Sequence, residues 1–290
     1  MSLTFLSFYN QKNRKYMTMK VFKLLPVLFA SLAFPQSTRF VYQVSMKPDA
    51  ANKADIKTEQ ANLDVTPQGS VFYSAKAIQR DSIMQRMRQT RTFDRNQMQD
   101  LRTAINYVVE KDYPKQDITL KNRIGRDQYA YTESKPFQWK ILNETAKIGE
   151  YNTQKAETQY GGRTWYAWFT TEVPFQDGPY KFSGLPGLIV KAEDSNNDYS
   201  FDLMQTKKIA EPYALQNRGG QVITLKKADY QKMEKRFQDD PASFFSNNSG
   251  GGGFGGNNGR RINTDPQRMK QMQDRFKEEQ KKNNNPIELN

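Results

Sequence analysis

The sequence predicts an α+β fold that is mainly antiparallel β: a meander-rich curved sheet with one inserted helix, and a flexible C-terminal tail that carries an isolated helix. Short runs of β-branched and aromatic residues follow one another through the middle of the chain, and turn residues separate them. Apolar residues at helical spacing interrupt these runs at about residues 78–104 and predict either a continuous helix or one that is broken near Thr90. From residue 246 the chain is mostly glycine and asparagine, a composition that cannot pack a core.

The strand signals are short, and most are bounded by Gly, Pro, Asn or Asp. We expect strands at residues 40–44, 63–65, 71–73, 105–109, 118–120, 128–132, 137–141, 145–151, 152–160, 164–170, 188–192, 199–203 and 221–225. Residues 228–237 and 265–282 carry apolar positions at helical spacing and predict two helices.

Composition divides the 290 residues into four parts. Residues 1–33 read as an upstream extension and a secretory signal peptide. Residues 34–245 read as a single β-rich core domain, residues 246–264 as a Gly/Asn-rich linker, and residues 265–290 as a polar helical tail.

The signal peptide is predicted from Met19 to about Ala33. Lys20 and Lys23 supply its basic start, residues 24–30 its apolar centre, and Ser31 and Ala33 the small residues that a signal peptidase reads. The apolar run is too short to span a bilayer. We therefore expect an exported protein that is periplasmic or extracellular.

The composition excludes several kinds of chemistry. The chain has no cysteine and no histidine, so it has no disulfides, no Ser-His-Asp or Cys-His machinery, and no zinc site with these ligands. We predict no catalytic residue, no metal and no cofactor. The net charge is +13, but basic and acidic residues are interspersed without a basic stripe, so we expect no nucleic-acid partner.

The loop at residues 182–189 has a proline between two glycines, with apolar residues among them. The six residues singled out are Gly184, Leu185, Pro186, Gly187, Leu188 and Ile189. Glycine and proline favour backbone conformations that other residues resist. One interpretation is a rigid apolar loop at the mouth of a pocket; the other is a buried structural turn that leads into the next strand.

This hexapeptide resembles the one after which the GLPGLI family of Bacteroidota proteins is named. The surrounding pattern is also similar: Gly162–Trp168, Val173-Pro174, Gly178–Phe182, and the C-terminal Asn285–Leu289. The similarity runs from Phe40 to that C-terminal motif. It implies an exported protein of uncharacterised function and assigns no catalytic residue.

Three tryptophans lie on predicted strands: Trp139, Trp165 and Trp168. Trp165 and Trp168 differ in parity, so they face opposite sides of a regular strand. We expect one of them in the core and the other in a ligand groove or under a helix.

Two groups of acidic residues have the composition of chemical sites. Asp194 to Asp198 has the Asp-x-Asn-x-Asp spacing of a calcium loop, but Tyr199 replaces the glycine, which favours a polar hairpin loop. Glu172, Asp177, Glu193 and Asp194 offer carboxylates for glycoside hydrolysis, although their spacing singles out no pair.

The predicted tail helix has a narrow apolar stripe of Met269, Met272 and Phe276 among basic residues. Such a stripe is too narrow to fold alone but can dock on an anionic surface such as lipid headgroups. We expect this tail to be independent of the core domain.

These observations favour a non-enzymatic envelope protein that binds an apolar or amphipathic ligand, or another envelope protein. Two alternatives stay open: a carboxylate-dependent hydrolase that acts on envelope polymers, and a pure interaction module for an outer-membrane receptor.

Overall fold

The computed structural model describes residues 37–92, 101–125, 127–134, 137–213, 222–241, 244 and 266–289. All of them belong to one compact unit, Pro35–Asn290. The predicted signal peptide and the glycine-rich linker lie outside the described residues.

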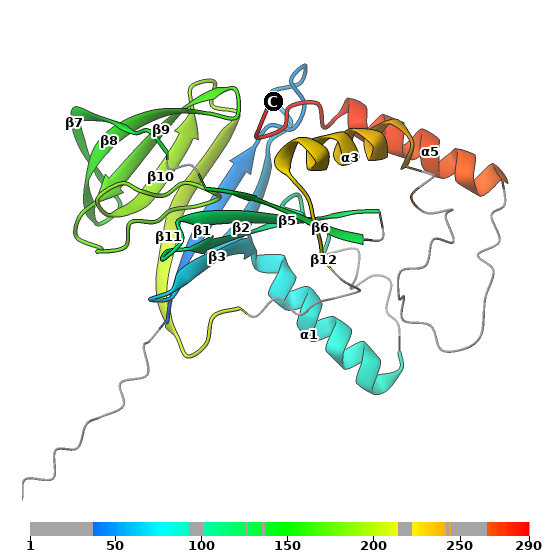
Figure 1. Ribbon diagram of the computed structural model, residues 1–290, viewed down its shortest axis with the longest axis horizontal. Coiled ribbons are helices and arrows are strands. Elements are labelled where there is room, and N and C mark those ends of the chain that lie inside the picture. The colour runs from blue at the N-terminus through cyan, green and yellow to red at the C-terminus, as the bar shows by residue number, and fades with distance from the viewer. Residues whose placement is uncertain are drawn as a thin grey trace, which may run out of the picture. The chain divides into compact units, whose positions relative to one another are not determined.

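The described strands form one twelve-stranded sheet (Figure 1). The strands are β1 (Ser37–Met46), β2 (Lys57–Val65), β3 (Gly69–Ser74), β4 (Tyr107–Asp112), β5 (Asp117–Ile124), β6 (Asp127–Glu133), β7 (Lys140–Ile148), β8 (Tyr151–Tyr160), β9 (Arg163–Thr170), β10 (Leu188–Asp194), β11 (Tyr199–Ile209) and β12 (Val222–Thr224). Their order is β12-β6-β5-β4-β3-β2-β1-β11-β10-β9-β8-β7. Apart from the parallel pair β12 and β6, neighbouring strands are antiparallel. The predicted fold class is confirmed.

The sheet is strongly curved. Phe72 on β3 and Phe201 on β11 lie three strands apart in the sheet, yet their ring centroids are 6.2 Å apart. Neighbouring strands are about 4.8 Å apart, so on a flat sheet three steps would separate these rings by about 14 Å. The sheet therefore curls around its own core.

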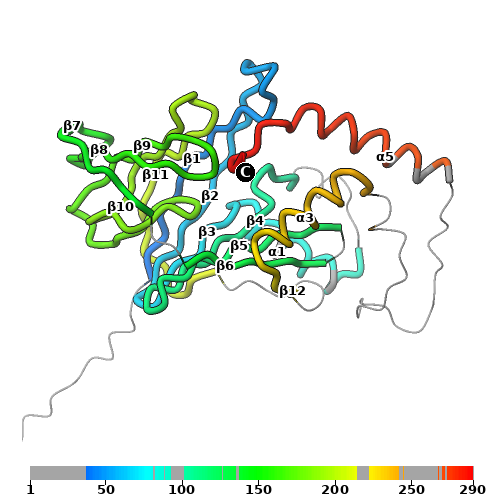
Figure 2. Tube along the Cα trace, turned by 45° about the horizontal axis from the view of Figure 1, so that its top comes forward, coloured from blue at the N-terminus to red at the C-terminus, as the bar shows by residue number. Residues whose placement is uncertain are grey.

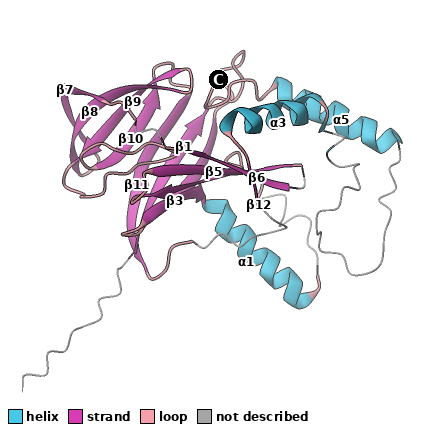
Figure 3. Cartoon of the chain, viewed as in Figure 1, coloured by secondary structure: helices cyan, strands magenta, loops and turns pink. Residues whose placement is uncertain are grey.

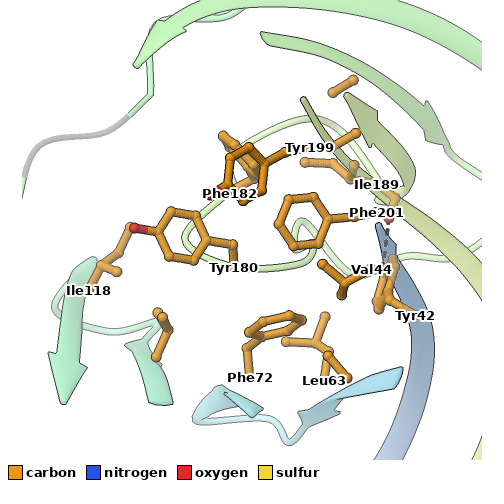
Figure 4. Packing of buried hydrophobic residues seen from close by; sticks show 14 of the residues in the cluster. Tyr42, Val44, Leu63, Phe72, Ile118, Tyr180, Phe182, Ile189, Tyr199 and Phe201 are labelled. Carbon is orange, nitrogen blue, oxygen red and sulfur yellow. Dashed lines mark hydrogen bonds between the residues drawn. The ribbon is translucent and has the colours of Figure 1, made fainter. Parts of the chain in front are cut away.

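The loop that joins β9 to β10 fills this concave side. Figure 4 shows Tyr180 and Phe182 from this loop beside Phe201, with Phe72 below them. The Phe182 ring lies 4.7 Å from the ring of Trp165 and 6.3 Å from that of Phe201. The core is thus built from inward strand residues and from a loop packed between them.

The described part of the chain contains three helices beside the sheet: α1 (Ala75–Thr90), α3 (Lys227–Asp239) and α5 (Pro266–Lys281), coloured cyan in Figure 3. Ser74 caps α1 by accepting a hydrogen bond from the Lys76 amide at 3.2 Å. Phe276 of α5 packs on Phe237 of α3, with ring centroids 5.1 Å apart. None of the helices in the described ranges is both long and apolar enough to cross a bilayer.

Two predicted boundaries were wrong. The helix expected over residues 78–104 begins at Ala75 and ends at Thr90, and residues 101–106 are not helical. Leu101 and Ile105 have a helical spacing in the sequence. In the structure both side chains are buried from an irregular segment, so this spacing does not come from a helix face. The strand expected from Phe137 begins only at Lys140, because Phe137 and Trp139 leave the sheet and pack near Phe182, 5.5 and 6.1 Å from its ring.

The end of the chain returns to the sheet, as Figure 2 shows for the red segment beyond α5. The Asn285 amide donates to the Pro48 carbonyl at 2.9 Å, and the Leu289 amide donates to the Gly161 carbonyl at 2.7 Å. The expectation of an independent tail is therefore wrong for residues 285–289. Their partners lie far away in sequence, so no local pattern reveals the contact.

Candidate functional site

The loop between β9 and β10 (residues 171–187) is held from inside by its own backbone. The Gly184 amide donates to the Gln176 carbonyl at 3.1 Å, and the Ile189 amide to the Asp177 carbonyl at 2.9 Å. Leu185, with Leu188 and Ile189 at the start of β10, is buried, whereas Gly184 and Pro186 are exposed. This arrangement favours the buried structural turn over a loop at the mouth of a pocket.

Gly187 explains why the turn needs glycine. Its φ is +147°, and a Cβ there would lie 2.0 Å from the Thr170 carbonyl oxygen. A side chain would therefore meet backbone that cannot move without opening the sheet. Gly184, at φ +89°, has open space where its Cβ would be.

A buried ion pair anchors the same loop. The Lys111 ammonium on β4 pairs with the Asp177 carboxylate and donates to the Gly178 and Phe182 carbonyls at 2.7 and 2.9 Å. Tyr113 donates to the other Asp177 oxygen. Burial lowers the pKa of Lys111 against the opposing pull of Asp177. All of these contacts hold the loop between β9 and β10 in place, so the ion pair has a structural role.

A second ionic cluster joins the loop to the C-terminus. Lys181, which is buried, binds Glu133 at 2.6 Å, Glu288 at 2.5 Å and the hydroxyls of Tyr131 and Tyr160. Lys227 at the start of α3 contacts the same two carboxylates at 2.7 and 2.9 Å.

The charges of this cluster set the pKa of Glu288. Burial alone would raise that pKa, but the charge of Lys181 and the hydrogen bonds from Lys181, Tyr180 and Lys227 outweigh burial and lower it to about 2. The pKa of Glu133 is lowered for similar reasons, with burial opposed by Lys181 and Lys227. Both acids are therefore ionised at neutral pH and act as fixed anchors.

A third cluster occupies the sequence that resembled a calcium loop. The Arg163 guanidinium contacts Asp194 at 2.8 Å and Asp198 at 3.3 Å, and it donates to Asn285 at 2.5 Å. Asp194 also accepts hydrogen bonds from the amides of Asp198 and Tyr199. The carboxylates are thus occupied, and the polar-hairpin interpretation fits. In the described part of the chain no three acidic side chains gather as a metal would require.

The three tryptophans do not share a site. Trp165 is fully buried against Phe182, and the Trp139 indole donates to the Ser183 carbonyl at 2.8 Å. Trp168 faces the opposite side from Trp165, as its parity predicts, with the Lys155 ammonium 5.5 Å from its ring. None of them lines the cleft described next.

The four acids considered for glycoside hydrolysis are also dispersed. Asp177 and Asp194 are buried in the ion pairs above, Glu193 pairs with Lys191 at 2.8 Å, and Glu172 accepts from Asn152 at 2.9 Å. None lines the cleft. Their arrangement supplies no carboxylate pair across an open site.

An open cleft of about 1540 Å³ lies at one end of the sheet. It is bounded by the end of β1, the start of β2, α1, the start of β4, the end of β5, and the facing parts of α3, α5 and residues 283–287. The backbone of these elements can be followed in Figure 2. The volume is ample for a small ligand or a single acyl chain.

The cleft combines an apolar surface with basic side chains. Apolar side chains in the lining include Val44, Met46, Ile105, Tyr107, Phe237 and Ile287. The basic lining residues are Lys57, Lys76, Arg80, Arg102, Lys121 and Arg123. The acidic lining residues in the described ranges are Glu59, Glu234 and Glu279.

Two of the acidic residues differ sharply. Glu59 is buried and accepts hydrogen bonds from Ser74, Thr103 and the Ala104 amide at 2.8 Å. Burial, with the charge of Glu288, raises the pKa of Glu234.

Sequence reasoning missed the cleft, although one signal was present. Lys76, Arg80 and Met84 are four residues apart and line the cleft from one face of α1. The helix is predicted from its apolar positions alone, so the prediction assigns no role to the basic residues Lys76 and Arg80. The opposite wall comes from residues near 237, 276 and 287, which no local pattern joins to α1.

Comparisons with known proteins cover part of the chain. Residues 161–191, which include the hexapeptide, match the family model Porph_ging, described as a protein of unknown function. No curated protein matches the chain. The structure of PNGF-II in space group C2 is similar with TM-score 0.49 and 16% identity, over 70% of this chain and 33% of that one. The structure of PNGF-II in space group P21 gives TM-score 0.48 and 16% identity, over 68% and 33%.

This chain therefore spans about a third of PNGF-II. A likeness at this level leaves the activity of this chain to be inferred from its own residues.

Proposed function

We propose that this protein is a binding protein that holds an apolar or amphipathic ligand in the cleft beside α1. The observation that carries the proposal is the open volume of about 1540 Å³ with apolar side chains from β1, β4, α3 and the C-terminal segment on its walls. Ligand sites are typically concave and mostly apolar, with a few polar groups that orient the ligand.

The surroundings of the cleft support binding over carboxylate chemistry. The acids considered for hydrolysis lie elsewhere, and Glu59 is engaged by two hydroxyls and a backbone amide. A carboxylate that is held in this way is a poor general acid or base.

The test is titration with a neutral apolar fluorophore, N-phenyl-1-naphthylamine. We expect saturable binding by the unmodified protein and at least about tenfold weaker binding by Met84→Trp, because the indole would occupy the cleft. Gln79→Trp is the matched control, since Gln79 is exposed on the same helix and does not line the cleft. Absence of saturable binding, or equal binding by Met84→Trp, would contradict the proposal.

We further propose that the protein is exported and belongs to the GLPGLI family. The signal-peptide layout supports export, and the complete hexapeptide within the matched residues 161–191 supports the family. The sheet-bearing unit begins at Pro35, just after the expected cleavage site. Mass spectrometry of the protein from its native host should give an N-terminus near Phe34; an intact residue 19 would argue against export.

A further inference from the structure

We infer that the ligand of this cleft is a single-chain amphiphile with an anionic head group, held at its head by the basic face of α1. The inference rests on the proposed function and adds the charge of the ligand. Six basic and three acidic side chains line the described part of the cleft. This imbalance attracts anions, because a concave site with low-dielectric walls concentrates the field of its charges.

Arg80 is the residue on which the inference depends most. It lies one turn after Lys76 and one turn before Met84 on the cleft face of α1. Its Nε is covered by protein atoms and has no hydrogen-bond partner within the described ranges. The Arg80 side chain as a whole is half-buried at the cleft wall, and its guanidinium carries five N–H donors and no acceptor, so an anionic head group in the cleft would supply acceptors to it.

Among the described residues, the cleft lining on the side of Arg80 includes the basic Lys76 and Arg102. The Lys76 ammonium donates to the Arg102 carbonyl at 2.8 Å, which brings the Arg102 segment against α1. Glu59, the buried acid nearby in the cleft lining, already accepts from Ser74 and Thr103. Lys121 differs, because Glu110 neutralises it at 2.6 Å. Among the described residues, Arg80 and Arg102 therefore have no carboxylate within ion-pair distance, in contrast to Lys121.

The rest of the cleft suits an apolar chain. Phe237 of α3, Phe276 of α5 and Ile287 of the C-terminal segment line it from elements other than α1. A ligand with a carboxylate or phosphate at one end and one acyl chain would place its head near Arg80 and its chain along these side chains. Charge-assisted hydrogen bonds from arginine to such a head group are short and strong.

The experiment measures displacement of N-phenyl-1-naphthylamine by dodecanoate, dodecanol and dodecylamine at neutral pH, where the acid and the amine are charged. We expect half-displacement by dodecanoate at about a tenfold lower concentration than by dodecanol, and dodecylamine to be the weakest. Arg80→Gln should remove the advantage of dodecanoate and leave displacement by dodecanol unchanged. Arg86→Gln, an exposed position of α1 outside the cleft, should behave like the unmodified protein.

The outcomes separate the two proposals. Equal displacement by dodecanoate and dodecanol, or an advantage that survives Arg80→Gln, overturns the anionic head group and leaves cleft binding intact. Failure of the fluorophore itself to bind overturns the proposed function. Displacement by acetate at the same concentrations would show a site for small anions and overturn the amphiphile.

Discussion

The loop between β9 and β10 and the cleft beside α1 use their side chains in opposite ways. In the loop, Tyr180, Phe182 and Leu185 are fully buried. The charged residues that hold the loop all form ion pairs: Lys111 with Asp177, and Lys181 with Glu288. In the cleft, half-buried apolar side chains such as Phe237 and Ile287 border open space, and Arg80 has a buried nitrogen with no partner among the residues that the structure describes. The hexapeptide, which is the most conspicuous motif of the sequence, is therefore packed in the core, whereas the cleft, which has a weaker sequence signal, is open. A conspicuous Gly-Pro motif marks a position that needs an unusual backbone conformation, and packing requires such conformations as readily as ligand contact does.

The buried pair of Lys111 and Asp177 gives the largest expected effect. Lys111→Met should lower the free energy of unfolding by about 3–5 kcal/mol, because it leaves the buried Asp177 carboxylate without its cation. Urea denaturation measures this loss. Lys115→Met is the control: Lys115 is 71% exposed in its pair with Asp112, where solvent screens the pair, so its loss should leave the denaturation midpoint nearly unchanged. Similar midpoints for the two variants would mean that the loop is not anchored through Lys111.

The two glycines of the hexapeptide provide the next test. Gly187→Ala should cost about 3 kcal/mol, because the new Cβ would collide with the Thr170 carbonyl at a positive φ. Gly184→Ala should cost about 1 kcal/mol, since its φ is also positive but nothing lies within 4 Å of the new Cβ. Thermal melting of both variants compares them directly. Equal losses would show that backbone strain alone, and not the close approach, selects glycine at residue 187.

The local architecture of the sheet could be predicted from the sequence, because it is written in neighbouring residues. In β9, Trp165, Ala167 and Phe169 alternate with outward residues, which identifies the strand and its two faces, and the Gly161-Gly162 turn before it indicates the hairpin with β8. The C-terminal anchor could not be predicted in this way. Lys181 and Glu288 are 107 positions apart, and each reads as an ordinary surface charge until the fold brings them together. The cleft has the same difficulty, since its walls come from segments that are far apart in the chain.

Acid sensitivity should distinguish the C-terminal anchor from ordinary surface charge. The pKa of Glu288 falls from its ordinary value of 4.5 to about 2 in the folded protein. A depressed folded-state pKa contributes stability that is complete above pH 4.5 and is lost as pH falls toward 2. Stability should therefore decline across this window, and Glu288→Gln should decline less steeply.

At neutral pH, Glu288→Gln should cost on the order of 2 kcal/mol, because Lys181 keeps only one of its two carboxylates. The control is Glu150→Gln at an exposed position, which should retain both the stability and the acid profile of the unmodified protein. If both variants follow the unmodified profile, the C-terminal segment is not held to the sheet in solution.

The smallest expected effect lies in the cleft itself. Met84→Ala should cost less than about 1 kcal/mol, because Met84 is only half-buried and borders open space, so truncation leaves no new sealed cavity. Leu185→Ala removes a side chain of similar size from the packed loop, where it is 1% exposed, and should cost about 3 kcal/mol. Denaturant midpoints at a shared slope compare the pair, since the slope tests that both variants unfold from the same folded state. A Met84→Ala loss as large as that of Leu185→Ala would show that α1 closes onto the sheet in solution. The hollow region would then be as packed as the loop, and the site for a ligand would disappear with it.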